Sequence, residues 1–588
     1  MSLEPIPSKI LYIDLSSKSF WVRDRHELFQ KYLGGSGVAI KILHEEIKPN
    51  INPLSADNVI VFTVGPLTGM YPLASKTVVM FKSPLTGNLG ESHAGGRSAI
   101  AIRMAGYGGI VIKGASDTPV YIAVHGDKVA FRDASTLWGM RSSYTVGRVL
   151  REVETGAGIR SIMRIGRAGE KLVSYACVVT ETYRHFGRLG LGAVWGSKKL
   201  KALVISGRRS IKPRDTKLYR EVYDSIFTTI TKSPIMKKYH DIGTAMNVTP
   251  LNKLKALPTK NLKEASFDNA DKISGEAIAE KFLGRRVACS HCPVSCIHLA
   301  ILKEPYATEP YFYKTIMISY DYELIYALGS MLQISSPEGL LKLIDKVEKE
   351  GLDAMSCGVA LAWATEMLEK GLIDKEILNG IVLKWGDFDN YIRAVDQLVE
   401  QSTEFYKALA KGVEYASKIY GGEEFALSFG GNEMPGYHTG PAAHIGYLTG
   451  ARHSHLNGAG YSIDEKFLKS NVKPNVEQIV DDLIKEESWR QILSSLVVCY
   501  FGRGIYKPDV VVKVLKTVDY NLNEEDLNKL GMEILQEKYR FKLREGFDIK
   551  KLRLPKRVSE TLTPLGIVTP EFVMEGVNLY IKKLHLIE

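Results

Sequence analysis

The chain has 588 residues, 45% of them hydrophobic and 24% charged, which is the composition of a large globular protein of two or three domains. No apolar run reaches the roughly 18 residues that a membrane-spanning helix needs, and six cysteines in this length exclude a disulfide scaffold. The net charge of +11 favours an acidic partner, which could be nucleic acid, an anionic substrate or an acidic electron-carrier protein.

The first 208 residues are predicted to form β-structure. Short runs of β-branched and aromatic residues, each closed by turn residues, predict strands at 9–15, 59–65, 76–82 and 109–114. The stretch 119–133 is expected to form a hairpin around a His-Gly-Asp-Lys turn, and 201–207 a closing strand.

Helical periodicity replaces this pattern further along the chain. Apolar residues recur on one helical face at Leu340, Leu341, Ile344 and Val347. A second apolar stripe runs from 359 to 368 and stops at a glycine. The tail beyond residue 415 is also predicted to be helical, interrupted by a loop rich in glycine and histidine at 429–462.

The predicted fold class is therefore α+β. A β-rich cofactor-binding domain is expected at 1–208, a mostly helical domain with a cysteine cluster at 209–415, and a mostly helical C-terminal domain at 416–588.

Three cysteines lie within eight residues in CSHCPVSC, at Cys289, Cys292 and Cys296. An iron–sulfur cubane needs four thiolates, usually three close together and one remote, and this spacing favours such a cluster. Zinc is the alternative because His291 and His298 lie nearby, but no second ligand pair of the usual zinc pattern follows. Spacing does not choose the remote thiolate among the other cysteines, which are Cys177, Cys357 and Cys499.

Two stretches rich in glycine and cations lie in the β-rich region, at 83–98 and 186–201. Glycines expose backbone N–H groups, and together with cations these groups can hold a phosphate. The alternative is that the glycines only form tight turns between strands. Two such stretches in one domain favour a large phosphorylated cofactor lying across it.

Acid–base candidates occur in two places. Asp321 and Glu323 stand beside aromatic residues at the start of an apolar helical run, where we expect Asp321 to be a capping or surface carboxylate. Four of the thirteen histidines, including His453 and His455, lie within 438–462, and this density favours a site over isolated structural histidines.

Taken together, these stretches resemble the tungsten-dependent aldehyde ferredoxin oxidoreductases over nearly the whole chain. The motifs that carry the resemblance are YLGGSGVAI (32–40), GPLTG (65–69), KSPLTG (82–87), AGYGGIVIKG (105–114), GRLGLGAVWGSKKLKA (187–202), CSHCPVSC (289–296), YELIYALGS (322–330) and GLDAMS (351–356).

The resemblance implies a tungsten or molybdenum ion held by two pyranopterins, with Mg²⁺ between the pterin phosphates as a further expectation, and a [4Fe–4S] cluster. By position, the cluster ligands would be Cys289, Cys292, Cys296 and Cys499. Glu323 would be the carboxylate beside the metal, and His455 the histidine facing the substrate, with His453 as its alternative. The positions expected at the pterins are Lys76, Gly95, Gly96, Arg188, Gly190, Glu348, Asp353 and Asn457.

Three positions depart from the family pattern. Lys76 replaces an arginine that bridges pterin and cluster, which keeps the charge but loses the fork geometry. Asn457 stands where the family often has a lysine. The first pterin-recognition motif is present from Glu348 to Asp353, but Ser494 replaces the carboxylate that begins the second copy.

The resemblance implies oxidation of a small aldehyde to a carboxylate, with ferredoxin as electron acceptor. A relative that reduces an acid or an aromatic acyl thioester is the first alternative, and a zinc-stabilised basic nucleic-acid-binding protein is the second. For the preferred function we expect no membrane and no nucleic-acid partner, and a homodimer is compatible with it. The start MSLEPIPSKIL shows no secretory signal, so a cytoplasmic enzyme is the expectation.

Overall fold

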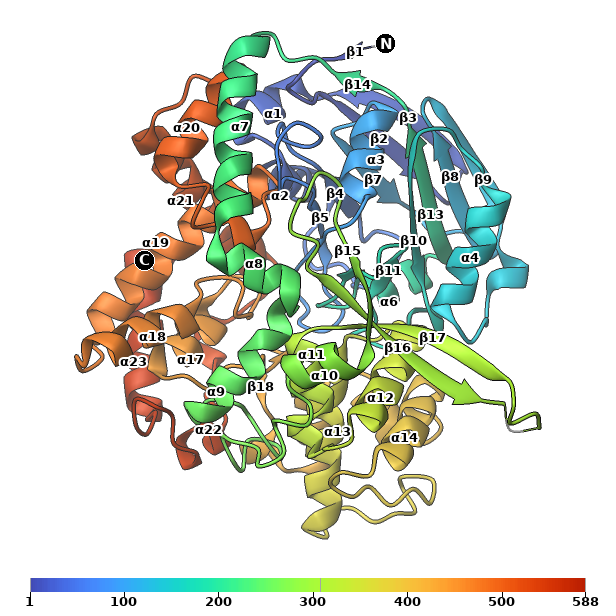
Figure 1. The fold of residues 1–588 in the computed structure, drawn as a ribbon, viewed down its shortest axis with the longest axis vertical. Coiled ribbons are helices and arrows are strands. Elements are labelled where there is room, and N and C mark those ends of the chain that lie inside the picture. The colour runs from blue at the N-terminus through green and yellow to red at the C-terminus, as the bar shows by residue number, and fades with distance from the viewer. Residues whose placement is uncertain (1, 307, 587–588) are drawn as a thin grey trace. The chain divides into compact units, whose positions relative to one another are not determined.

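The computed structural model (Figure 1) describes residues 2–306 and 308–586. The chain forms two compact units. Unit 1 contains the residues up to Met236 together with Ala288–Val294 and Lys485–Ile549. Unit 2 contains Lys237–Val287, Ser295–Ile484 and the residues from Lys550 onward. The three-domain division at residues 208 and 415 stays a prediction, whereas the α+β fold class is confirmed.

The first sheet of unit 1 contains the four strands that the sequence predicts near the N-terminus, and two that it does not predict, at Ser19–Asp24 and Leu89–Ala94. Its six strands lie in the order β3 (Ser19–Asp24), β2 (Lys9–Asp14), β7 (Gly109–Lys113), β4 (Ile60–Thr63), β5 (Thr77–Lys82) and β6 (Leu89–Ala94). Strands β2 and β7 run parallel, and the other neighbouring pairs of this sheet run antiparallel. Helix α2 (Gly35–Glu46) packs on β4 and β5, and α21 (Glu524–Arg544) packs on α2.

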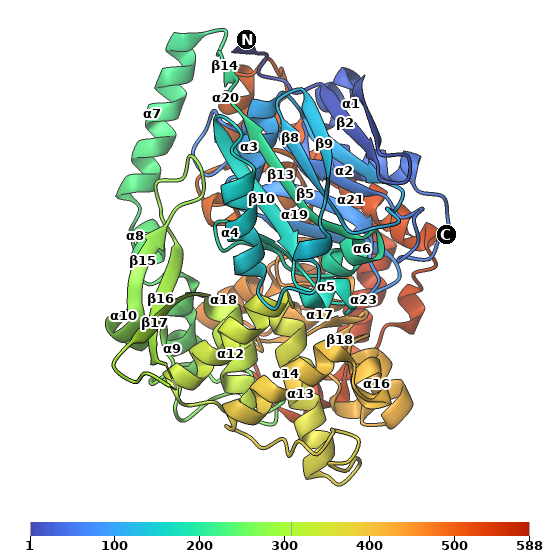
Figure 2. The ribbon, with the colours of Figure 1, turned by 90° about the vertical axis from the view of Figure 1, so that its right-hand side faces the viewer.

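The second sheet of unit 1 contains the predicted hairpin and closing strand. Its order is β12 (His185–Phe186), β11 (Val178–Thr180), β10 (Ile159–Ile165), β13 (Leu200–Gly207), β8 (Val120–His125) and β9 (Lys128–Asp133). Side chains alternate across β8, as a strand requires. Ile122 and Val124 join the core shared with the first sheet, whereas Tyr121 and Ala123 pack toward α4 (Ser143–Val153) on the other face. Figure 2 shows α4 lying beside β10.

Unit 2 is mostly helical. Helices α11 (Tyr322–Leu328), α12 (Pro337–Glu350) and α13 (Ala354–Glu369) pack together, and the predicted apolar face of α12 is fully buried. The backbone turns out of α12 at Gly351, which has a left-handed φ of 76°.

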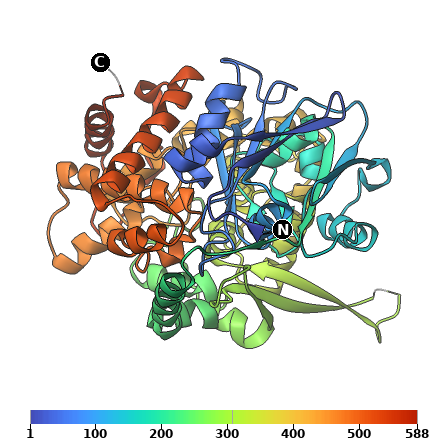
Figure 3. The same ribbon diagram turned by 90° about the horizontal axis from the view of Figure 1, so that it is seen from above.

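One expectation for unit 2 is wrong, and one sheet was not predicted. Within the mostly helical region after residue 208, β15 (Leu283–Val287), β16 (Ile297–Pro305) and β17 (Tyr313–Tyr320) form an antiparallel sheet. Figure 3 shows β16 and β17 as a long two-stranded arm. The stretch 429–462 is not one loop, because it contains β19 (Asn432–Glu433), α17 (Pro441–Thr449) and the start of α18 (Gly460–Ser470).

The missed helix α17 has a capping group that is remote in sequence. The carboxylate of Asp464, in α18, accepts hydrogen bonds from the N–H groups of Ala442 and Ala443 at 2.9 and 3.0 Å. These are N–H groups that a helix cannot satisfy internally. In the described part of the chain, no helix is both long and apolar enough to cross a membrane.

Candidate active site and cluster site

The six cysteines fall into two groups by exposure. Cys289, Cys292, Cys296 and Cys499 are partly exposed, whereas Cys177 and Cys357 are buried. Cys357 lies inside α13, where burial raises the pKa of its thiol. Cys177 directly precedes β11 in the core of unit 1. The partly exposed group is the set that the resemblance assigns to the cubane.

In unit 1, one residue ties the cysteine loop to the segment of Cys499. Leu73 donates its N–H to the carbonyl oxygen of His291 at 3.3 Å, and its own carbonyl accepts the N–H of Cys499 at 2.9 Å. Leu73 holds this position with a left-handed φ of 64°. The loop closes on itself through the N–H of Cys292, which donates to the carbonyl of Cys289 at 3.1 Å. The structure therefore brings Cys289, Cys292 and Cys499 into one region, and Cys296 follows Cys292 four residues along the chain.

Gly95, Gly96 and Lys76 lie in the same region of unit 1. A Cβ on Gly95 would lie 2.7 Å from Sγ of Cys289 and 3.6 Å from Nζ of Lys76. Gly96 accepts a hydrogen bond from the N–H of Ser290 at 2.9 Å. Glycine is thus required where the end of β6 passes the first cysteine.

Lys76 is only partly exposed, and across residues 2–306 and 308–586 its ammonium group makes no hydrogen bond or ion pair. Its backbone N–H donates to the carbonyl of Val497 at 3.1 Å, two residues before Cys499. A half-buried cation without a protein partner fits an anionic group held beside these cysteines.

The chemistry of the thiols fits an iron–sulfur cubane, which needs four thiolate ligands. The donor set of four partly exposed thiols, none of them in a disulfide, matches the needs of a [4Fe–4S] cluster.

The second glycine-rich stretch has a packing explanation. Gly190 has a left-handed φ of 84°, and a Cβ there would lie 2.1 Å from the carbonyl oxygen of Ser174. Cβ atoms on Gly192 and Gly196 would lie 2.6 and 1.9 Å from the carbonyls of Cys177 and Gly169. These glycines let α6 (Leu191–Ser197) approach neighbouring backbone closely, and Gly192 and Gly196 lie in this helix and not in turns between strands. Arg188, half-buried between β12 and α6, and Gly190 remain the pterin candidates of this stretch.

In unit 2, the structure brings Glu323 and His455 together. Nε2 of His455 lies 3.4 Å from Oε1 of Glu323, and the N–H of Gly436 donates to Oε2 of Glu323 at 3.1 Å. Only 15% of the Glu323 side chain and 9% of the His455 side chain is exposed. The two residues come from α11 and from the turn between α17 and α18, more than a hundred residues apart.

Aromatic rings cover this pair. The ring of Tyr437 lies 5.2 Å from that of His455 and stacks on Tyr461 at 4.5 Å. Burial, with a smaller contribution from the charge of Glu323, raises the pKa of Tyr437 well above its usual value, so its hydroxyl stays protonated. Tyr437 was not among the predicted site residues. The signal that could have found it was its place directly before the stretch with four histidines.

His453, the alternative to His455, has a packing role. Nδ1 of His453 lies 3.0 Å from the carbonyl oxygen of Tyr447, and a Cβ on Gly430 would lie 2.4 Å from its ring. His453 is buried, with 1% of its surface exposed. Asn457 accepts the N–H of Arg452 at 3.3 Å and so holds the turn that carries both histidines.

The carboxylates of the first pterin motif lie at the join of α12 and α13. Glu348 is in the last turn of α12, and Asp353 accepts the N–H of Met355 at the start of α13. The hydroxyl of Ser356 donates to Asp353 at 2.7 Å and lies 2.6 Å from Oε2 of Glu433. Glu433, in β19, is a buried carboxylate that sequence patterns did not single out.

Ser494, which begins the second copy of the pterin-recognition motif, also has a hydrogen-bond partner. The hydroxyl of Ser494 lies 2.5 Å from that of Tyr500, in unit 1. The Arg490 guanidinium lies 4.9 Å from the centre of the Tyr500 ring. Ser494, which stands where the family pattern has a carboxylate, therefore pairs with a tyrosine hydroxyl.

Comparison with known proteins assigns this fold and these residues to one class of oxidoreductase. Residues 10–207 match the family model for the N-terminal domain of aldehyde ferredoxin oxidoreductase, and residues 221–581 match the model for domains 2 and 3 of the same proteins. The chain belongs to the aldehyde ferredoxin oxidoreductase family, and the expectations of family and enzyme class are confirmed.

Among its relatives, the tungsten-containing aldehyde ferredoxin oxidoreductase of Thermococcus kodakarensis is 32% identical over 574 residues, which cover 95% of this chain and 92% of that protein. The protein of the same description from Pyrococcus furiosus is 31% identical with the same coverage. An aliphatic sulfonate oxidoreductase, WOR-like subunit, of P. furiosus is 30% identical over 430 residues, covering 70% of this chain and 66% of that subunit.

A solved structure also shares the fold. The active-site complex BamBC of benzoyl coenzyme A reductase, in complex with 1,5 dienoyl-CoA, aligns with a TM-score of 0.84 at 22% identity. The alignment covers 99% of this chain and 94% of that one.

Proposed function

We propose that this protein oxidises an aldehyde to a carboxylate and passes the electrons to ferredoxin, as a tungsten (or molybdenum) bis-pyranopterin enzyme with a [4Fe–4S] cluster. The reaction is RCHO + H₂O → RCOO⁻ + 3 H⁺ + 2 e⁻. The observation that carries the proposal is the shielded pair of Glu323 and His455, which offers a proton acceptor and a hydrogen-bond donor side by side.

Glu323 is the proposed general base. One of its oxygens is held by the N–H of Gly436, and the other faces His455. A positioned carboxylate can take a proton from attacking water as the new C–O bond forms, which in general contributes about 10²–10⁴-fold to a rate.

His455 is the proposed hydrogen-bond donor to the carbonyl oxygen of the aldehyde. Negative charge builds on this oxygen during attack, and a donor fixed in a water-poor site stabilises that charge. The rings of Tyr437 and Tyr461 support the orientation of the imidazole and limit the access of water. His453 is proposed to be structural, because its ring is packed against Gly430.

When bound, the tungsten pterin would supply a two-electron acceptor and a Lewis acid for the substrate oxygen. In unit 1, Lys76, Gly95, Gly96, Arg188 and Gly190 are the proposed contacts of the cofactor. In unit 2, the proposed contacts are Glu348, Asp353 and Asn457. Cys289, Cys292, Cys296 and Cys499 are the proposed cluster ligands, and Mg²⁺ and a homodimer are further proposals.

Reduction of an acid or an aromatic acyl thioester is the second candidate. The observation that favours it is Ser494, whose hydroxyl pairs with Tyr500 where the family pattern has a carboxylate. A changed contact at one pterin would change the electron affinity of the cofactor and with it the favoured direction of the reaction.

The test is an assay in both directions with protein purified without oxygen. Aldehyde with benzyl viologen as acceptor should give turnover, and an aromatic acyl thioester with a low-potential reductant should give none. The reverse result would establish the reductase. Tungsten, molybdenum and iron are measured by mass spectrometry on the same sample, and a preparation without iron or either heavy metal would contradict both candidates.

A further inference from the structure

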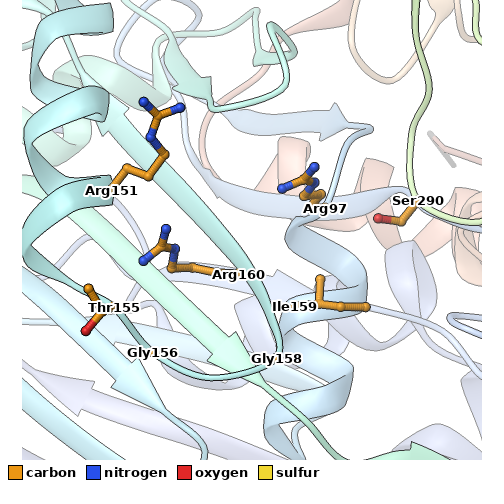
Figure 4. Close-up of a pocket in the computed structure, with 8 residues that line it drawn as sticks. All are labelled: Arg97, Arg151, Thr155, Gly156, Gly158, Ile159, Arg160 and Ser290. Carbon is orange, nitrogen blue, oxygen red and sulfur yellow. The ribbon is translucent and has the colours of Figure 1, made fainter.

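Unit 1 contains a cavity of about 570 Å³ whose lining is strongly basic. Figure 4 shows Arg151 and Arg160 on one side and Arg97 with Ser290 on the other. The remaining wall is the loop from Thr155 to Gly158, between α4 and β10. The proposed function above uses none of the three arginines.

The three guanidinium groups lack acidic partners in the described parts of the chain. Arg97 and Arg151 are exposed and make no hydrogen bond or ion pair through their side chains within residues 2–306 and 308–586. Arg160 donates only to the backbone carbonyl oxygen of Glu154. Three uncompensated positive charges around one hollow attract negatively charged groups.

The cavity adjoins the loop of the cysteine cluster. Ser290, which forms part of its wall, is the neighbour of Cys289 in the chain. The N–H of Ser290 donates to the carbonyl of Gly96, and Arg97 follows Gly96. The segment Gly95–Arg97 and the segment Cys289–Ser290, which this hydrogen bond joins, therefore both line the cavity and both lie at Cys289.

The basic run from Lys198 to Arg220, the other basic stretch of unit 1, is less suitable as a docking surface. Lys198 is buried and donates to the carbonyls of Ala56 and Gly114, and burial lowers its pKa to about 7. Lys201 is buried and paired with Glu170. Arg209 is paired with Asp127. Lys198 and Lys201 are therefore used inside the protein, and the charge of Arg209 is compensated by a surface carboxylate.

We infer that the cavity lined by Arg97, Arg151 and Arg160 is the docking site for acidic side chains of the one-electron carrier protein. This inference rests on the proposed function. Carboxylates of the carrier would enter the cavity and bring its redox group beside the cysteine loop. Two carrier molecules each accept one electron for every aldehyde oxidised, which balances the two electrons released.

The test compares an acidic ferredoxin with benzyl viologen as electron acceptor. In the double variant Arg97→Glu/Arg151→Glu, kcat/KM for ferredoxin should fall about tenfold or more, because reversing charges at a docking site slows association. The dependence of kcat/KM on ionic strength should also become weaker. The rate with viologen, which needs no protein docking, should stay unchanged.

Arg220→Glu is the matched control, because it reverses an exposed charge in the other basic stretch of the same unit. It should leave kcat/KM for ferredoxin unchanged. A large loss in Arg220→Glu combined with a normal double variant would overturn the inference and move docking to that stretch.

Direct binding separates this inference from the proposed function. Calorimetric titration of the holoenzyme with oxidised ferredoxin should show weaker binding to the double variant than to wild type, whether or not aldehyde is a substrate. Failure of wild type to oxidise aldehyde, with this difference in binding intact, would reject the proposed function alone. Equal binding of ferredoxin to both proteins, with loss only of inorganic pyrophosphate binding, would show a small-anion site and overturn the docking inference.

Discussion

Asp321 and Glu323 lie two residues apart in the sequence, and the structure gives them different partners. Asp321 is the N-cap of α11 and accepts the N–H of Leu324 at 3.4 Å, as the sequence predicts for a capping carboxylate. Glu323 points instead to His455 and to the N–H of Gly436. The two carboxylates have different partners because of helix geometry. The N-cap side chain folds back on the helix, whereas a side chain of the first turn projects from it.

This pair allows a matched test of the proposed base. Glu323→Gln keeps the size of the side chain but removes the charge that accepts a proton, so kcat should fall by about 10²-fold or more. Tungsten and iron contents and the melting temperature should stay close to wild type. Steady-state kinetics with aldehyde and viologen measure the effect.

Asp321→Ala is the control. Loss of the cap should lower the free energy of unfolding by about 1 kcal/mol, with kcat reduced far less than in Glu323→Gln. Wild-type turnover by Glu323→Gln would remove this residue from the mechanism.

Which residues could be located from sequence depended on the range of their contacts. The three clustered cysteines were visible because their ligand spacing is local. The choice of Cys499 over Cys357 came only from the family resemblance. Cys499 is partly exposed and donates its backbone N–H to Leu73, whereas Cys357 is buried in α13, and spacing contains neither contact.

At the scale of elements, the end of β6 passes close to the cysteine loop, where Gly95 lies against Cys289. In Gly95→Ala, the new Cβ would lie 2.7 Å from Sγ of Cys289, so either the end of β6 or the thiolate must move. We expect a lower iron content per chain and an altered electron paramagnetic resonance spectrum of the reduced cluster.

Gly504→Ala is the matched control, because Gly504 is near Cys499 in sequence and, among the described residues, no atom beyond its chain neighbours lies within 4 Å of the position that its new methyl group would occupy. Its iron content and spectrum should match wild type. An unchanged spectrum in Gly95→Ala would show that Cys289 does not depend on this contact.

Helices and strands were likewise predicted where their signals are local in the sequence, and missed where they depend on distant residues. The strands of unit 1 that were found, which are β2, β4, β5, β7, β8, β9 and β13, have period-two alternation and turn residues, and these are local signals. The helix α17 was missed because glycine and histidine obscured its pattern and because its cap, Asp464, lies more than twenty residues away. The arm of β16 and β17 was missed because its strands are separated from the other β-structure by a long helical stretch.

At the scale of the whole molecule, the net charge of +11 does not describe one uniform surface. Several lysines of the basic run are buried or paired, as are Lys82 with Glu545 and Lys538 with Glu91 in unit 1. The unpaired charge that remains at the cavity of Arg97, Arg151 and Arg160 is therefore more informative about partners than the total.

Three buried groups of unit 2 should set the pH dependence of stability on the acid side. His438 and His444 contact each other at 2.9 Å. Burial lowers the pKa of His438 to about 4 and that of His444 well below its usual 6.5. Between pH 6.5 and about 4, the unfolded chain binds protons that these folded histidines do not, so the pair makes stability fall as pH falls. Each proton changes the slope by about 1.4 kcal/mol per pH unit.

Asp464 acts in the opposite direction. Burial raises its pKa to about 7, so between its unfolded pKa of 3.8 and about pH 7 the folded protein binds a proton that the unfolded chain has lost. Its contribution therefore makes stability fall as pH rises.

Asp464→Asn should remove this offset and steepen the loss of melting temperature between pH 6.5 and 4.5. His438→Gln/His444→Gln should flatten or reverse that loss. Scanning calorimetry at a fixed heating rate compares the three proteins. Because every other titrating group is common to them, parallel curves would mean that these groups titrate alike in the folded and unfolded chain.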